Sequence, residues 1–126
     1  MLTNDTYQTY LAILKSELVP ALGCTEPIAV AYAAAKAAEV LGTRPERAEL
    51  WCSGNIVKNV KGVVVPNTGG LKGIDSAAIA GIIGGDPALG MQVLETVTEA
   101  RHAEIKRLLT AGLCQTRLIE GEDNLF

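Results

Sequence analysis

Residues 22–42 read LGCTEPIAVAYAAAKAAEVLG, and this stretch predicts the central helix of the fold. Thr25 is a residue type that caps helix N-termini, and Gly42 stands where glycines commonly end helices. We therefore expect a helix over about residues 26–41. The run of alanines between Ala29 and Ala38 leaves this helix almost no bulky face. Such a helix packs closely on several sides, which suits the interior of a larger protein.

Outward from this helix, the sequence predicts an α+β fold in which four helices pack on a small sheet. An apolar stripe at helical spacing runs along residues 7–18, and Asp86 with Pro87 is a typical helix start. Alternating or β-branched residues mark three candidate strands. The whole of residues 1–126 is expected to be one domain, the N-terminal part of a larger fold. We expect helices at about 4–19 (ended by Pro20), 26–41, 75–83 and 86–111, strands at about 48–53, 60–65 and 113–119, and polar loops at 53–59 and 66–73.

Composition narrows the classes of function. The 126 residues carry a net charge of −3, with scattered Lys and Arg, so we expect no nucleic-acid partner. The longest apolar run, at 28–35, is too short to cross a membrane, and the first residues do not resemble a signal peptide. We therefore expect a cytoplasmic protein. The mean hydropathy of +0.24 is high for a small domain, which indicates apolar surface that a partner or a further part of the protein covers.

Cys24 is the residue that most suggests chemistry. It lies just before the predicted helix, where the positive end of the helix dipole favours a thiolate, and thiolates act as nucleophiles or metal ligands. The alternative is a small buried cysteine that fills space beside Gly23. Cys52 and Cys114 fall in strand-like runs and are expected to be packing residues. Three cysteines without close spacing do not indicate a disulfide framework.

Three motifs carry a resemblance to a known family: GCTEPIA at 23–29, SGNIVKN at 53–59 and VVPNTG at 64–69. In this order and spacing they resemble the N-terminal part of the L-cysteine desulfidase family, which is related to the iron–sulfur L-serine dehydratases. The similarity extends over about residues 7–120. It implies that Cys24 is one of three thiolate ligands of a [4Fe-4S] cluster. The family's other cluster cysteines belong to a C-terminal part that this chain lacks. We therefore expect a fragment, a split subunit or a truncated gene product that holds no cluster alone.

The same resemblance implies β-elimination, in which L-cysteine gives sulfide, ammonia and pyruvate, or L-serine reacts similarly. Glu26 and Lys58 are the candidates for the base, and Lys58 also offers a cation for the substrate carboxylate. Polar side chains next to Cys24 and in the two loops are expected to bind the small amino-acid substrate: Thr25, Ser53, Asn55, Asn59, Asn67 and Thr68.

Each polar segment also has a plainer interpretation. Residues 53–59 are equally typical of an Asx-type turn with a solvated Lys58. The glycine-rich loop at 67–73 matches neither the Walker pattern nor Gly-x-Gly-x-x-Gly, so nucleotide binding is not expected. His102, the single histidine, has no partner at metal-ligand spacing and is expected to be a surface or hydrogen-bonded residue.

A different class of function competes with catalysis. The chain is also typical of an assembly module, whose alanine-rich helix and apolar surface bind a separate C-terminal polypeptide or a second copy. The catalytic interpretation makes a geometric prediction. Cys24 and the loops at 53–59 and 67–73 must meet at one open, concave site. Cys24 should lie within roughly 10–12 Å of a polar residue from each loop, a reach set by side-chain lengths plus one substrate.

Overall fold

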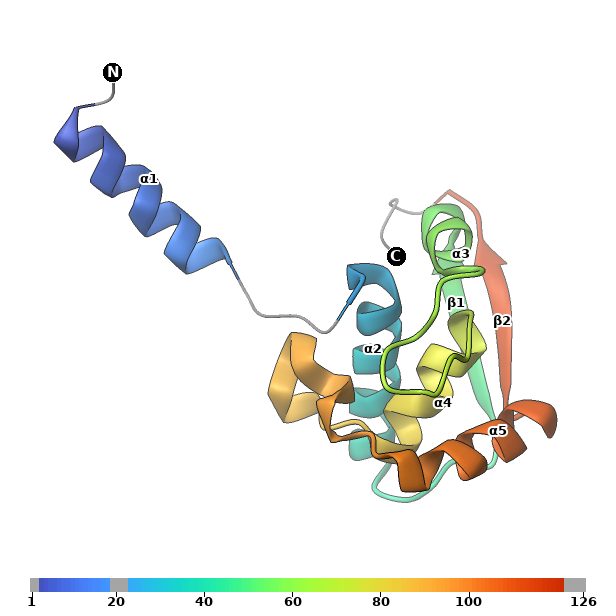
Figure 1. Ribbon diagram of the computed structural model, residues 1–126. Helices are drawn as coiled ribbons and strands as arrows, with labels where there is room; N and C mark the ends of the chain where they lie inside the picture. The colour runs from blue at the N-terminus through green and yellow to red at the C-terminus, as the bar shows by residue number, and fades with distance from the viewer. Residues whose placement is uncertain (1–2, 19–22, 122–126) are drawn as a thin grey trace.

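The computed structural model describes residues 3–18 and 23–121, and it confirms the α+β fold (Figure 1). Within these residues, five α-helices and two 3-10 segments accompany a two-stranded sheet, so the expected count of four helices is too small. In chain order the elements are α1 (Asn4–Glu17), α2 (Thr25–Leu41), β1 (Ala48–Ser53), α3 (Gly54–Val60), α4 (Ile74–Gly84), η1 (Pro87–Thr96), η2 (Glu99–Arg101), α5 (His102–Thr110) and β2 (Cys114–Ile119).

The core is built around α4, which is buried along most of its length and packs against both α2 and β2. The approach of α2 is so close that a Cβ added at Gly81 would overlap the backbone of Ala31. Only glycine leaves room for this contact. Ile28, Ala31 and Ala35 are buried on α2. The close packing predicted for the alanine-rich helix is therefore present on this side of it.

The sheet consists of β1 and β2 in parallel, with Ala48 opposite Cys114 and Ser53 opposite Ile119. Parallel strands need a long crossover, and here the crossover contains α3, α4, η1, η2 and α5. The two strands expected at 48–53 and 113–119 are thus confirmed, the second starting one residue later.

The third expected strand, at 60–65, is wrong. Val60 ends α3, and Gly62 turns the chain at a φ of 89°, so the β-branched run is interrupted before it can pair. What remains is a single antiparallel bridge between Val64 and Lys72. Val60 and Val65 are nevertheless fully buried, so these residues serve the core without forming a strand.

The long helix expected at 86–111 is also wrong, although its start is right. The Asp86 side chain accepts a hydrogen bond from the Ala88 N–H at 3.0 Å, and Pro87 follows. Gly90 then adopts a φ of 57°, and Thr98 is extended, so helical geometry is lost twice. The segment divides into η1, η2 and α5 because backbone breaks override its apolar periodicity.

Helix α1 stands apart from the other elements (Figure 1). Thr3 caps it by accepting from the Thr6 N–H at 3.2 Å. Its apolar stripe, which includes Tyr7, Tyr10 and Leu14, is about half exposed. The expected end of this helix at Pro20 lies outside the described residues.

Over the described ranges, no single helix is both long and apolar enough to cross a membrane. The pair α4 and η1 meets the requirements of length and composition together, but the two segments are bent by 105° at their junction.

Candidate functional site

Cys24 occupies the N-cap position of α2 with an exposed side chain. Its backbone is extended, at φ −70° and ψ 143°, whereas Thr25 is already the first helical residue. The expectation that Thr25 caps this helix is therefore wrong. The Cys24 side chain makes no capping hydrogen bond. The thiol is thus exposed at the positive end of a 17-residue helix, which is the setting that the sequence predicted.

Residues 54–59 of the polar segment lie in helix α3, which corrects the expectation of a loop, and Ser53 ends β1. Ser53 is buried and caps α3, accepting from the Ile56 N–H at 3.5 Å. The three polar residues within α3, Asn55, Lys58 and Asn59, are exposed. Their i, i+3, i+4 spacing places them on one face of α3. That spacing was visible in the sequence, and it was missed because Gly54 suggested a turn.

The loop at 66–73 is present as expected, and its polar side chains hold it together. Asn67 has a φ of 58°, and its amide donates to the Leu94 carbonyl oxygen at 3.0 Å. The buried Thr68 hydroxyl donates to the Val65 carbonyl oxygen at 2.7 Å and accepts from the Leu71 N–H at 3.1 Å. These bonds give Asn67 and Thr68 the role of shaping the loop.

His102 anchors the same loop, a role that sequence reasoning did not assign. Its Nε2 lies 2.7 Å from the Asn67 carbonyl oxygen. Because a carbonyl oxygen only accepts, this nitrogen donates. A Cβ at Gly69 would lie 3.0 Å from Nδ1 of the same ring. The histidine is hydrogen-bonded, as expected, and the glycine makes room for it.

The three segments meet around the first turn of α2. Glu26 Oε1 accepts from the Asn59 Nδ2 at 3.5 Å, which joins α2 to the polar face of α3. On the other side, Gly23 packs on Pro66 so closely that a Cβ there would lie 2.7 Å from the proline Cγ. The residues that flank Cys24 thus contact α3 and the start of the loop. The Glu26–Asn59 hydrogen bond thus joins the helix start that carries the exposed Cys24 to one amide of the polar face of α3.

The other two cysteines do not suit metal binding. Cys52 and Cys114 are each only 6% exposed. Burial raises the pKa of Cys114 to about 12, and the negative charge of Asp75 adds to the rise. The same two causes raise the pKa of Cys52. Both thiols therefore resist forming thiolates, as packing residues do.

A whole iron–sulfur cluster does not fit this set of donors. Across residues 3–18 and 23–121, no three His, Cys, Asp or Glu side chains gather where they could hold a metal ion. Of the three cysteines, Cys24 alone is exposed, and it lies at a helix N-terminus. The described part of the chain can thus offer one exposed cysteine to a cluster.

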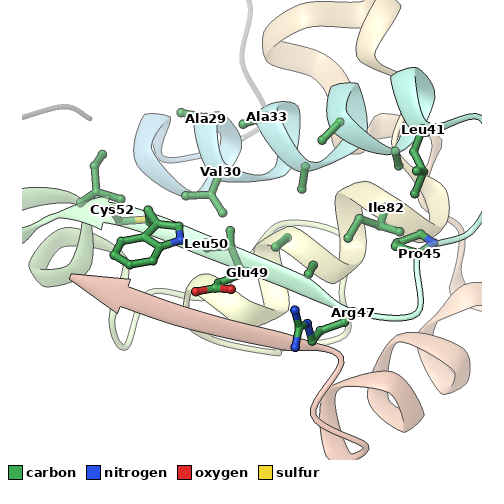
Figure 2. A pocket seen from close by; sticks show the side chains of 17 residues that line it. Ala29, Val30, Ala33, Leu41, Pro45, Arg47, Glu49, Leu50, Cys52 and Ile82 are labelled. Carbon is green, nitrogen blue, oxygen red and sulfur yellow. The ribbon is translucent and has the colours of Figure 1, made fainter. Parts of the chain in front are cut away.

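A large groove lies elsewhere, between α2 and β1 (Figure 2). It has a volume of about 530 Å³, and mainly apolar residues line it. Among them are Ala29 and Ala33 from α2 and Leu50 from β1. None of the residues predicted to bind substrate or metal lines this groove, so the groove and the α2 N-terminus are separate features.

The chain is similar to a group of longer bacterial proteins. It is 56% identical over 119 residues to a UPF0597 protein of Lachnoclostridium phytofermentans. It is 52% identical over 118 residues to a UPF0597 protein of Finegoldia magna. It is also 50% identical over 123 residues to a UPF0597 protein of Aeromonas hydrophila.

These matches include nearly all of this chain but only part of each relative. They cover 94%, 94% and 98% of the chain, and 28% of each of the three relatives. The chain therefore spans a little over a quarter of the length of the curated relatives that it matches. The relatives' names state no activity, substrate or cofactor. No protein-family model matches the chain, and no solved structure matches it.

Proposed function

We propose that this chain is one part of an iron–sulfur lyase that eliminates the β-substituent of L-cysteine or L-serine. The observation that carries the proposal is the contact set at the start of α2. There the exposed Cys24 lies between Gly23, which packs on Pro66, and Glu26, which is hydrogen-bonded to Asn59. These contacts join the three motifs that resemble the desulfidase family.

Cys24 is the proposed cluster ligand of this chain. A [4Fe-4S] cluster with one open iron would supply a Lewis acid that polarises the bond from Cβ to its leaving group. The cysteine suits the role because it is exposed at a helix N-terminus. With one exposed cysteine among the described residues, the remaining ligands would come from outside the described part of the chain.

The polar face of α3 is the proposed substrate-binding surface. Lys58 would pair with the substrate carboxylate, while the Asn55 and Asn59 amides would hold the carboxylate or amino group. The exposed Thr25 hydroxyl lies next in sequence to Cys24 and could add a further hydrogen bond. Ser53, Asn67 and Thr68 are assigned positioning roles, because their hydrogen bonds shape α3 and the loop.

Glu26 is the stronger of the two candidate bases. It is half-buried, and Asn59 orients its carboxylate. Removal of the α-proton and loss of the β-substituent leave an enamine. The enamine tautomerises and takes up water, which releases ammonia and pyruvate. Lys58 remains the alternative base. We place this reaction in the cytoplasm, where free thiols such as the three cysteines here stay reduced.

The test is reconstitution with the part that this chain does not match. The chain is co-expressed anaerobically with the Lachnoclostridium relative from which the matched 119 residues have been removed. Pyruvate formation from L-cysteine and from L-serine is measured, together with iron–sulfur absorbance. We expect colour and activity in the pair, and neither in the chain alone.

Cysteine variants make this test specific. Cys24→Ala should abolish both the absorbance and the pyruvate, whereas Cys52→Ala, the matched removal of a buried thiol, should preserve both. A fully active Cys24→Ala pair would contradict the proposal.

A second candidate function is a non-catalytic assembly module. The exposed apolar groove between α2 and β1 favours it, because soluble proteins rarely leave such surface uncovered. Binding of the truncated relative without any colour or pyruvate would support this candidate instead.

A further inference from the structure

We propose that the free edge of β1 binds an extended strand, which lies in the groove beside α2. The strand would come from a second polypeptide equivalent to the part of the longer relatives that this chain does not match. The inference goes beyond the proposed lyase function and does not depend on it, because it involves neither Cys24 nor a cluster.

Among residues 3–18 and 23–121, the backbone of β1 has a strand partner on one edge and none on the other. The Ala48 N–H donates to the Leu113 carbonyl oxygen at 2.8 Å, so this residue points its backbone groups toward β2. The backbone N–H and C=O groups of successive residues in a strand point to opposite edges. Those of Glu49 and Trp51 therefore point away from β2. In the described part of the chain, β2 is the only strand that pairs with β1.

The side chains of these two residues are engaged across the sheet with β2. Arg117 of β2 forms an ion pair with the Glu49 carboxylate. The same guanidinium lies 5.8 Å from the centre of the Trp51 ring. Both interactions lie on the β2 side of the strand. The backbone N–H and carbonyl groups of Glu49 and Trp51 therefore remain available to a further strand.

The groove provides the space that a further strand needs. Helix α2 packs on α4 and η1, and it is set apart from β1 by the groove (Figure 2). The exposed alanines Ala29, Ala33 and Ala37 form its wall on the α2 side. Such small side chains allow a close approach by another backbone. A strand added to β1 would lie under α2 and would bury this wall.

The shape and chemistry of the groove favour a strand over a small molecule. A pocket for a small molecule usually places several polar side chains around its ligand. Here the charged side chains that line the groove are confined to Arg47 and Glu49, and the rest of the lining is mostly apolar. A row of backbone donors and acceptors beside an apolar wall is the arrangement used in β-strand addition.

The relatives indicate where the strand comes from. The groove lies within the region that aligns with them, and that region is only 28% of their length. Most of each relative is therefore available to cover this surface. An exposed, apolar strand edge favours aggregation, and natural proteins generally cover such edges.

Amide hydrogen exchange tests the proposed pairing directly. The probe is the Lachnoclostridium relative without its matched 119 residues, co-expressed and co-purified with this chain. In the chain alone, the Glu49 and Trp51 amides should exchange fast, while those of Leu50 and Cys52 are protected. In the complex, we expect the Glu49 and Trp51 amides to slow by at least about tenfold. Unchanged exchange at both amides would overturn the proposal.

A matched pair of variants tests the wall of the groove. Ala33→Glu places a charge in the groove, and Ala103→Glu makes the same change at an exposed alanine of α5. Both should retain the circular dichroism of the folded chain. We expect Ala33→Glu to weaken binding at least about tenfold and Ala103→Glu to leave it unchanged. Equal binding by the two variants would contradict the proposal, as would a dimer of this chain alone that protects the same amides.

The lyase proposal can fail without this one. If the complex forms, protects these amides and shows no colour, the strand inference stands and the cluster assignment is lost. If colour and pyruvate appear while the two amides stay unprotected, the lyase proposal stands and the strand inference is lost.

Discussion

The two sides of α2 carry similar small residues and have opposite surroundings. Ala31 and Ala35 are buried, at the side where Gly81 brings α4 into contact. Ala33 and Ala37 are exposed along the groove beside β1. The neighbouring element makes the difference. On one side α4 comes into direct contact through Gly81, while the other side faces an open groove lined by residues of β1, α3 and α4. A run of alanine thus indicates that a helix can be approached closely, but not which of its sides is covered.

The largest expected effect follows from the covered side. Gly81→Ala should lower the free energy of unfolding by about 3 kcal/mol or more, because its Cβ would overlap the Ala31 backbone. Urea denaturation measures the change. Gly54→Ala is the matched control, since a Cβ there meets only Leu118 Cδ1, at 3.9 Å. It should change stability by less than about 1 kcal/mol. Similar losses in the two variants would mean that α2 and α4 are not so closely packed.

A smaller effect compares the two sides directly. Ala31→Leu adds bulk to a fully buried position and should cost about 1–3 kcal/mol of stability. Ala33→Leu adds the same bulk on the groove side, where it should change stability by no more than about 0.5 kcal/mol. Thermal or urea unfolding of the two single variants measures both values. A large loss in Ala33→Leu would show that the groove is already filled in the free chain.

The three cysteines also differ in exposure, and we expect their rates of alkylation to differ accordingly. Cys24 is exposed, whereas Cys52 and Cys114 are buried with raised pKa values. Iodoacetamide at neutral pH should therefore modify Cys24 at least about a hundredfold faster than the other two. Peptide mass spectrometry over time measures the rates, and 6 M urea should make the three rates similar. Comparable rates in the native chain would refute this assignment of environments.

The smallest effect is a pH dependence of stability. The Cys114 pKa is raised from 9.0 to about 12 in the folded chain, so the folded state binds the thiol proton more tightly. This contribution is fully present below pH 9 and is lost as the pH rises toward 12. Cys114→Ala should therefore show a shallower loss of stability over this range than the parent chain. Urea midpoints of both chains measured across this range test the effect, and equal slopes in the two chains would contradict it.

The fold was predictable where local signals agreed with tertiary packing. Three local patterns each indicated their element from its own residues. They are the alanine run ending at Gly42, the helix start at Asp86 and Pro87, and the alternation at 48–53. The errors at 60–65 and 86–111 have a common cause. In both, several of the apolar residues are buried, among them Val60, Val65 and Leu94, but a glycine at positive φ changes the path of the backbone. Hydrophobic pattern reports burial more reliably than it reports element boundaries.

The contacts between the motif segments were predictable and the roles of their side chains were not, while the concave substrate site at Cys24 stays a prediction. The motifs at 23–29, 53–59 and 64–69 do meet at the start of α2. The sequence could not reveal that the Thr68 hydroxyl donates to the Val65 carbonyl oxygen, or that His102 is hydrogen-bonded to the Asn67 carbonyl oxygen. Such bonds depend on the exact path of the loop and on contacts with distant helices. The spacing of Asn55, Lys58 and Asn59 was the one signal present in the sequence and overlooked.

The parallel pairing of β1 with β2 also sets an order of events during synthesis. Nearly half of the chain lies between the two strands, which pair Ala48 with Cys114. Until residues 114–119 have been made, β1 has no β2 with which to pair. Closing so long a loop is entropically costly and slow, so the helices of the crossover are expected to gather before the sheet is completed. The nascent chain therefore passes through a period in which β1 is exposed to chaperones and to other unfinished chains.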